Sequence, residues 1–238
     1  MVITWWRPVS RGLGGLCASP FGKRAANYPA PKAHCRMIAI IDSGGANIAS
    51  VRFALERLGA SGELTSDPRV IERADKVILP GVGMAATAMG VLRGHGLIDC
   101  IRGLSQPVLG LCLGMQLLFE YSSEGDTQLL GVIGGDCTLF DADMAASQAL
   151  SIPHMGWNRI KAIDSTNRHP LLRGVEDGAH VYFVHSFYAG LSADTIASCH
   201  YGTDFTAIAG NDNFMGCQFH PERSGPVGEQ ILKNFLAL

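Results

Sequence analysis

One cysteine of the chain lies in a tight glycine setting, Gly110-Leu111-Cys112-Leu113-Gly114. The apolar run before it predicts a buried strand and the residues after it predict a helix, which is the context of a nucleophile elbow. A cysteine at such a turn projects from the sheet edge, and the N–H groups of a helix N-terminus favour the reactive thiolate. Because the chain has 29 glycines, a structural cysteine beside incidental glycines is the alternative interpretation.

A histidine and a glutamate further along the chain could serve this cysteine. His220 follows the apolar run Met215–Phe219, and Glu222 lies two residues beyond it, so both side chains point to one side of an extended segment. Pro221 fixes part of the geometry between them. Alone, His-Pro-Glu would be interpreted as an ordinary exposed turn. Together with the elbow it predicts a triad of nucleophile, base and orienting acid, made of Cys112, His220 and Glu222.

Acyl transfer at a cysteine also needs hydrogen-bond donors for the negatively charged oxygen of its intermediate. The segment Pro80-Gly81-Val82-Gly83 ends a second apolar run, and its glycines allow the backbone at Val82 or Gly83 to aim an N–H into the site. The amide of Leu113, directly after the cysteine, is the second expected donor. A phosphate-binding loop is disfavoured, because no Gly-Lys-Ser or Gly-Lys-Thr follows. A plain strand-to-helix turn is the remaining alternative.

Strands and helices that could position these residues alternate in the first part of the chain. Buried strands are predicted at Met37–Ile41, Lys76–Leu79 and Pro107–Leu111. Helices are predicted around 48–58, where Asn47 can act as the cap, and around 88–92, 97–104 and 113–120. Successive strand-to-helix units indicate a parallel sheet covered on both faces, with a site at the carboxyl ends of the strands.

After residue 125 strand-like runs follow one another, and a helix is predicted at Gly228–Leu236. The runs are Ser151–Pro153, Asn158–Ile163, His180–His185, Thr195–His200, Thr206–Ala209 and Met215–Phe219. We expect them to extend the same sheet and to add an antiparallel flap. The predicted fold is a single α/β three-layer domain whose central sheet is mostly parallel, with antiparallel additions.

Composition narrows the class of protein. Hydrophobic residues make up 47% of the 238 residues and charged residues 17%, a balance that suits a well-buried domain. No apolar stretch approaches the ~18 residues of a membrane span. The formal charge of −2 argues against a protein that mainly binds nucleic acid. Seven cysteines without a C-x-x-C pair indicate neither a zinc site nor a redox dithiol, so reduced thiols in the cytoplasm are expected.

The first 36 residues differ from the remainder in charge. They hold six Lys or Arg residues and no acidic residue, a composition similar to that of an organelle transit peptide. They show no helical period and no apolar core of a secretory signal. We expect residues 1–36 to be a disordered basic leader, or to follow from a start codon upstream of Met37, and residues 37–238 to form the domain.

Several of these motifs together resemble those of the class I glutamine amidotransferases. They are Gly-Leu-Cys-Leu-Gly-Met-Gln at 110–116, Pro-Gly-Val-Gly at 80–83 and Gln-Phe-His-Pro-Glu-Arg-Ser at 218–224. Two further motifs, Pro-His-Met-Gly-Trp-Asn at 153–158 and Tyr-Phe-Val-His-Ser at 182–186, are similar to one branch of this family. That branch contains the glutaminase subunits of imidazole glycerol phosphate synthase, an enzyme of histidine biosynthesis. The resemblance extends from Met37 to Leu238 and implies a flavodoxin-like topology.

The resemblance implies a reaction for the triad and a substrate for the site. Cys112 would attack the carboxamide of glutamine and form a thioester, releasing ammonia, while His220 acts as acid and base and Glu222 orients it. The residues that would contact glutamine are Gly83, Gln116, Glu124 (at the α-amino group), His185 and Ser186.

The resemblance also implies a partner. Ammonia would pass to a (β/α)₈-barrel cyclase subunit in a heterodimer, which produces imidazole glycerol phosphate and an aminoimidazole carboxamide ribonucleotide. The residues that match the family's interface are Pro153, His154, Trp157, Asn158 and Tyr182. No metal, organic cofactor, nucleic acid or membrane is expected to take part.

The chain departs from the family pattern in two loops. Ser43-Gly44-Gly45-Ala46 stands where the family commonly has Tyr-Gly-x-Gly, and Met84-Ala85-Ala86 stands where an aromatic residue is frequent.

Other functions stay open. A glutaminase for pyridoxal phosphate or anthranilate synthesis is an alternative, against which the motif at 153–158 argues. An idle regulatory subunit is another, against which the intact triad argues. A cysteine peptidase of similar fold is a third alternative. An assay of ammonia release from free glutamine, compared with a panel of peptides, would distinguish the two activities.

Overall fold

Continuous apolar segments form the strands at the centre of the molecule. The computed structural model describes residues 37–45, 48–166 and 168–238, so the leader at 1–36 and the cap expected at Asn47 lie outside the described residues. Four central strands are buried along their whole length: β1 (Ile38–Ile41), β3 (Lys76–Gly81), β4 (Val108–Cys112) and β13 (Phe214–Cys217). Such burial requires cover on both faces of the sheet.

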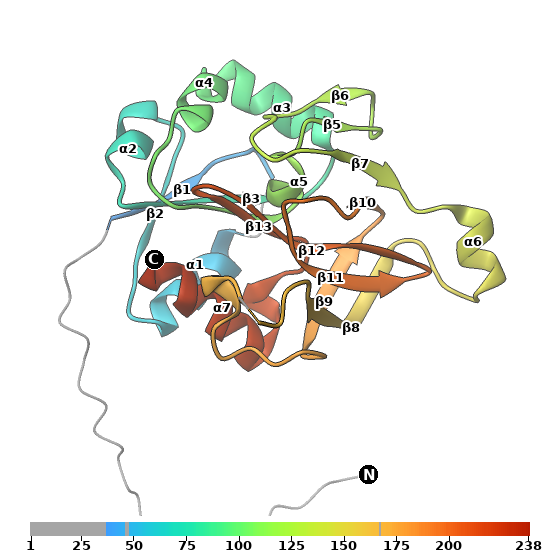
Figure 1. The fold of residues 1–238 in the computed structure, drawn as a ribbon. Coiled ribbons are helices and arrows are strands. Elements are labelled where there is room, and N and C mark those ends of the chain that lie inside the picture. The colour runs from blue at the N-terminus through green and yellow to red at the C-terminus, as the bar shows by residue number, and fades with distance from the viewer. Residues whose placement is uncertain (1–36, 46–47, 167) are drawn as a thin grey trace, which may run out of the picture. The chain divides into compact units, whose positions relative to one another are not determined.

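Five parallel strands and four antiparallel strands make up the main sheet. The other members are β2 (Gly62–Thr65), β8 (His154–Ala162), β9 (His180–His185), β11 (Thr195–Tyr201) and β12 (Thr203–Asn211). The order is β2-β1-β3-β4-β13-β12-β11-β8-β9, parallel from β2 to β13 and antiparallel beyond (Figure 1). In chain order the parallel strands run 2-1-3-4-5, which is the flavodoxin-like arrangement.

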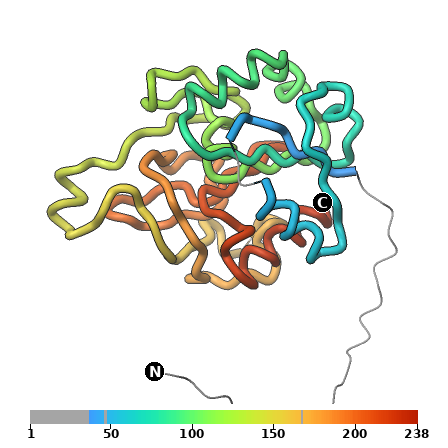
Figure 2. The backbone as a smooth tube through the Cα atoms, turned by 180° about the vertical axis from the view of Figure 1, so that it is seen from behind, coloured from blue at the N-terminus to red at the C-terminus, as the bar shows by residue number. Residues whose placement is uncertain are grey.

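Helices cover the two faces of the sheet (Figures 1 and 2). One face carries α1 (Ile48–Arg57) and α7 (Gly225–Ala237). The other carries α2 (Pro68–Arg73), α3 (Ala85–Gly94), α4 (Leu97–Arg102) and α5 (Leu113–Gln116). Successive strand residues alternate between the two cores, since Ile38 and Ile40 pack on the α1 side and Ala39 and Ile41 on the other. The three-layer α/β fold is confirmed.

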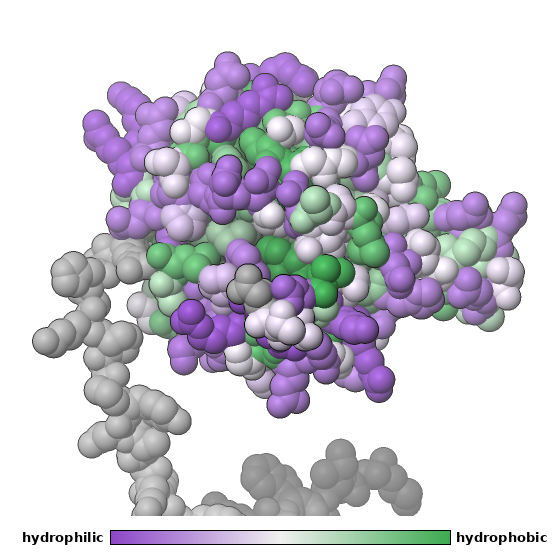
Figure 3. All heavy atoms as spheres, viewed as in Figure 1, coloured by the Kyte–Doolittle hydropathy of each residue, from purple (hydrophilic) through white to green (hydrophobic). Residues whose placement is uncertain are grey.

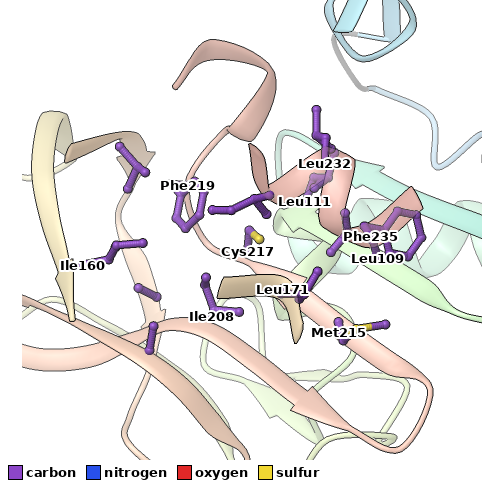
Figure 4. Close-up of a cluster of buried hydrophobic side chains, with 14 of the residues drawn as sticks. Leu109, Leu111, Ile160, Leu171, Ile208, Met215, Cys217, Phe219, Leu232 and Phe235 are labelled. Carbon is purple, nitrogen blue, oxygen red and sulfur yellow. The ribbon is translucent and has the colours of Figure 1, made fainter. Parts of the chain in front are cut away.

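A second sheet and a small helix lie beside this framework. The sheet has the order β10-β7-β5-β6, and the helix α6 follows β7. The bounds are β5 (Tyr121–Ser122), β6 (Thr127–Gln128), β7 (Asp136–Leu139), α6 (Ala142–Ser147) and β10 (Phe187–Ala189). Two short 3₁₀ turns are η1 (Pro170–Leu172) and η2 (Pro221–Arg223). Figure 4 shows the larger core, where Leu109 and Leu111 of β4 lie with Leu232 and Phe235 of α7.

Some elements differ from the predictions. The sequence does not predict β2 or α2, because β2 has a polar, partly exposed sequence at the sheet edge and α2 has only six residues. The helix predicted over 113–120 is wrong in length. It ends at Gln116, because the carbonyls of Leu117 and Phe119 accept from the segment at 130–131. Ser151–Pro153 is not a strand, since the Tyr201 hydroxyl, rather than a neighbouring strand, binds the Ser151 backbone.

The surface shown in Figure 3 is mostly hydrophilic at its upper and lower parts, and hydrophobic residues gather along its middle. Within the described ranges, no helix has the length and apolar character that crossing a membrane requires.

Candidate active site

The turn at Cys112 brings a strand and a helix unusually close together. Cys112 ends β4 with φ 53° and ψ −111°, and α5 begins at the next residue. A Cβ atom on Gly114 would lie 1.8 Å from the carbonyl oxygen of Leu79, and one on Gly110 would lie 2.5 Å from the Gly114 carbonyl oxygen. Both positions therefore require glycine, as the nucleophile-elbow interpretation predicts. Cys112 itself is 7% exposed.

Three adjacent parallel strands deliver the candidate catalytic groups to one edge. Gly81 of β3 pairs with Cys112 of β4, and Leu111 pairs with Cys217 of β13. Because parallel strands end on the same side of a sheet, the segments that follow them meet there. These segments carry the expected oxyanion donors after β3, the nucleophile after β4 and His220 after β13.

His220 and Glu222 form a buried pair beside Cys112. The Nδ1 atom of His220 lies 2.8 Å from Oε1 of Glu222, with side-chain exposures of 9% and 3%. Burial lowers the pKa of His220, but the neighbouring Cys112 thiol and Glu222 carboxylate outweigh it, so the pKa is raised. Among the described residues, no group bonds to Nε2 of His220. That nitrogen is therefore available to a substrate.

A cavity of about 310 Å³ opens at this edge. Its volume suits a small molecule. The sequence predicts every lining residue except Val184 and Phe187. The lining consists of Val82, Gly83, Cys112, Leu113, Gln116, Glu124, Val184, His185, Ser186, Phe187 and His220.

Two polar side chains of the cavity are fixed by neighbouring groups. The Glu124 carboxylate accepts a hydrogen bond of 2.7 Å from the backbone N–H of Ala85, the first residue of α3. The buried amide of Gln116 donates to the carbonyl of Phe187 at 2.8 Å and to Oε1 of Gln218 at 2.9 Å. A carboxylate and an amide are thus held in place around the thiol.

Gln218 is a site residue that the sequence does not reveal. Its amide Nε2 lies 4.0 Å from Sγ of Cys112, and the Gln218 side chain is fully buried. The thiol itself lies 3.7 Å from the carbonyl of Val184. The signal available was the spacing of Gln218 and His220, because residues i and i+2 of an extended segment share one side.

The residues expected at a partner interface divide between the surface and the interior. Trp157 of β8 and Tyr182 of β9 are directly opposed, with ring centroids 6.0 Å apart, and Trp157 is 56% exposed. Pro153 is also exposed. His154, in contrast, is 3% exposed and stacks on Tyr201 at 3.9 Å. Asn158 is half-buried and donates to the backbone carbonyl of His200. His154 therefore lies beneath the surface that carries Trp157.

The other cysteines of the described part of the chain lack a comparable setting. Burial raises the pKa of Cys137, Cys199 and Cys217, which keeps these thiols protonated, and it also raises that of the half-buried Cys100. In the same residues no group of three or more His, Cys, Asp or Glu side chains could hold a metal ion. Among the described cysteines, Cys112 is the one that lines the cavity together with His220.

Residues 39–238 match the family model described as glutamine amidotransferase class I. The matched region includes every residue of the cavity and of the buried His220–Glu222 pair. The chain therefore belongs to the class I glutamine amidotransferases, as the motifs predict.

Curated relatives narrow this class. The chain is 48% identical to imidazole glycerol phosphate synthase subunit HisH of Shewanella oneidensis, over 84% of this chain and 96% of that protein. It is 47% identical to the subunits of the same name from Xanthomonas axonopodis and Mannheimia succiniciproducens, over 84% and 83% of this chain and 97% of each relative. The chain belongs to this HisH family within the class I glutamine amidotransferases.

Solved structures agree with the fold. One described as a glutamine amidotransferase has a TM-score of 0.63 at 18% identity, covering 84% of this chain and 97% of its own. A glutamine amidotransferase from Thermotoga maritima has a TM-score of 0.56 at 16% identity, covering 86% of this chain and 84% of its own. At these identities the similarity shows the fold alone, which is the predicted one.

Proposed function

We propose that this chain hydrolyses glutamine to glutamate and ammonia through a thioester on Cys112, and that a partner cyclase consumes the ammonia in histidine biosynthesis. The observation that carries the proposal is the meeting of Cys112 and the His220–Glu222 pair at a cavity that also contains Gln116 and Glu124. The names of the relatives support the pathway, since they are subunits of imidazole glycerol phosphate synthase.

In the first step, Nε2 of His220 takes the proton of the Cys112 thiol, Sγ forms a bond to the carboxamide carbon, and the carbonyl electron pair moves to oxygen. The backbone N–H groups of Leu113 and of Val82 or Gly83 donate to this oxyanion. Their segments flank the thiol because β3 and β4 are neighbours whose ends are in register. Donors that are fixed before the reaction stabilise the developing charge without reorganisation.

In the second step, Nε2–H of His220 protonates the amide nitrogen, the C–N bond breaks and ammonia leaves. His220 then takes a proton from water, the resulting hydroxide attacks the thioester and the C–S bond breaks to give glutamate. Glu222 holds Nδ1 at 2.8 Å and stabilises the imidazolium, so that Nε2 faces the reacting atoms throughout.

The polar groups of the cavity account for the choice of glutamine. Glu124 carries a negative charge that can pair with the α-ammonium group. The segment His185–Ser186 and Gly83 line the rest of the cavity, and Gln116 supplies amide hydrogen bonds. A substrate without the α-ammonium group leaves Glu124 uncompensated, so free glutamine is favoured over peptide amides.

The partner is a (β/α)₈-barrel cyclase subunit that forms a heterodimer with this chain and produces imidazole glycerol phosphate and an aminoimidazole carboxamide ribonucleotide. We assign its docking to the exposed side of β8 and β9, with Pro153, Trp157 and Tyr182 as contacts. Large aromatic side chains at a surface are frequent anchors of interfaces. The catalytic domain comprises residues 37–238, and the reduced thiols suit the cytoplasm.

The substitution Cys112→Ala tests the proposal in the assembled complex. We expect glutamine-dependent synthesis and glutamate release to fall at least about a thousandfold, because the nucleophile is lost. Synthesis from added ammonium chloride should stay at the wild-type rate, since the partner's chemistry is intact. The two rates are measured by product formation and by coupled glutamate detection.

The control is Cys100→Ala, which removes a half-buried thiol of α4 that contacts the carbonyl of Pro68 and does not line the cavity. Its glutamine-dependent rate should match that of the wild type. If Cys112→Ala reduces both nitrogen sources equally, the role assigned to Cys112 is wrong. If the wild type releases no glutamate from glutamine at all, the proposed function is wrong.

A further inference from the structure

A continuous hydrogen-bond chain runs from strand β8 to the wall of the cavity. Nδ2 of Asn158 lies 3.3 Å from Nε2 of His154, and Nδ1 of His154 lies 3.0 Å from Nε2 of His185. Nδ1 of His185 in turn lies 2.8 Å from the carbonyl oxygen of Phe187. His185 and Phe187 line the cavity that contains Cys112.

The direction of this chain is fixed at the His185 end. A carbonyl oxygen can only accept, so Nδ1 of His185 must carry the hydrogen. Burial lowers the pKa of His185 to about 3 and that of His154 to about 4, so each ring is neutral and has one N–H. Nε2 of His185 therefore accepts from Nδ1–H of His154, and Nε2 of His154 is left as an acceptor.

The other end requires the same direction independently. The Asn158 amide is oriented by two backbone contacts, because its Nδ2 donates to the carbonyl of His200 at 2.9 Å and its Oδ1 accepts from the N–H of Arg159 at 2.7 Å. Nδ2 thus points a second hydrogen at Nε2 of His154, which is the acceptor that the opposite end leaves free. Both ends agree, and every donor meets an acceptor.

The chain continues toward the nucleophile. The Phe187 carbonyl that accepts from His185 also accepts from Nε2 of Gln116 at 2.8 Å. Gln116 donates to Gln218, whose amide lies 4.0 Å from Sγ of Cys112. The position of the Phe187 carbonyl therefore depends on His185 from one side and sets the Gln116 amide on the other.

We infer that His154 and Asn158 are positioning residues of the glutamine pocket, acting through His185 on the segment Val184–Phe187. The inference rests on the proposed function and goes beyond it. His154 is 3% exposed and stacks between Phe183 and Tyr201 at centroid distances of 4.8 and 3.9 Å. A phenylalanine ring could make the same stacking contacts, so the hydrogen bonds of the two ring nitrogens are what requires histidine here.

Nitrogen NMR of the full, ¹⁵N-histidine-labelled chain tests the chain directly. We expect His154 and His185 both to be neutral Nδ1–H tautomers near pH 7, because the two ends permit no other pattern. An Nε2–H tautomer at His185 would overturn the inference. This measurement needs no activity, so its result is separate from the fate of the proposed function.

The substitution His154→Phe tests the functional consequence in the assembled complex. It preserves the ring stack but leaves Nε2 of His185 without a donor, so we expect the KM for glutamine to rise about tenfold while kcat changes less than about threefold. Ammonia-dependent synthesis should not change. His154→Gln, whose amide can donate to His185, should recover part of the affinity.

The matched control is His180→Phe, which alters an exposed histidine at the other end of β9 and should leave the KM unchanged. Folding of each variant is checked by circular dichroism. A folded His154→Phe variant with the wild-type KM would refute the positioning role. Should that variant not fold, an Nε2–H tautomer of His185 in the wild-type chain would still refute the inference.

Discussion

The site holds its charge in a pair of side chains that solvent hardly reaches. Glu222 is within 2.8 Å of His220, and its second oxygen has no hydrogen-bond partner among the described residues. The raised pKa of His220 means that the folded state binds a proton more tightly than the unfolded state does. Stability and protonation are therefore linked at this residue.

The sign of the linkage gives a pH prediction for Glu222→Gln. A raised histidine pKa contributes stability that is complete below the unfolded value of about 6.5 and is lost as the pH rises through the folded value. We expect the variant to lose about 2 kcal/mol of unfolding free energy near pH 6 and distinctly less near pH 9. Urea denaturation at several pH values measures this difference.

The control for that experiment is Glu229→Gln on the exposed side of α7, which removes one negative charge away from the pair. Its effect on the unfolding free energy should not depend on pH in this range. A difference between the wild type and Glu222→Gln that grows with pH would contradict the assigned pairing.

Single residues of the site were predictable only where the signal is local. Cys112 stands out by its glycine neighbours, and His220 by its spacing to Glu222. Gln218 and Gln116 are 102 positions apart in sequence and bond because β13 lies beside β4. No local pattern encodes that contact. The inward orientation of His154 likewise depends on how β8 pairs with β9, which the sequence does not state.

Among the elements, the junction of β4 and α5 has the least freedom. Helix α5 is only one turn long and presses its backbone at Gly114 against the end of β3. The close approach brings the N–H groups after Cys112 next to the segment after β3. A side chain at Gly114 would push α5 away from the end of β3, and this movement would enlarge the oxyanion site.

The same change, glycine to alanine, should have opposite effects at two helical positions. Gly114→Ala would place Cβ within 1.8 Å of Leu79 O, and we expect a loss of about 3 kcal/mol or more of unfolding free energy. Gly90→Ala in α3 meets nothing within 4 Å and should gain about 0.5–1 kcal/mol through helix propensity. Thermal and urea denaturation measure both. Equal effects would show that the close approach is misassigned.

Elements were predictable in proportion to their burial. β1, β3, β4 and β13 are continuous apolar runs, and the sequence predicts each of them within one or two residues at most ends. The edge strand β2 reads Gly62-Glu63-Leu64-Thr65, in which one large apolar residue is too few to form a pattern. The small sheet of β5, β6, β7 and β10 is built from strands of two to four residues. Strands this short depend on tertiary pairing.

For the whole molecule, the exposed apolar side chains near the cavity are the feature that most needs a partner. Met155 and Trp157 on β8 are 64% and 56% exposed, and Val82 and Met84, which follow β3, are 42% and 54% exposed. Val184, which lines the cavity, pairs with Met155. The proposed docking side of β8 and β9 is thus continuous with the site that would produce ammonia.

Trp157→Ala should weaken binding of the cyclase subunit by about 2 kcal/mol, or roughly 30-fold in Kd, because a large aromatic anchor is lost. Isothermal titration calorimetry measures the affinity. The control is Leu64→Ala on β2, an exposed apolar residue at the opposite edge of the sheet, which should bind normally. Unchanged affinity in Trp157→Ala would place the interface elsewhere.

The alternation of side chains along β8 has one further consequence, because neighbouring residues of the strand have different roles. Met155 and Trp157 point outward, whereas His154 and Asn158 make their contacts inward. During evolution, the outward positions should change together with the surface of the partner, and the inward ones together with the pocket. The motif at 153–158 would then contain two sets of positions that evolve separately, because successive residues of a strand face opposite sides.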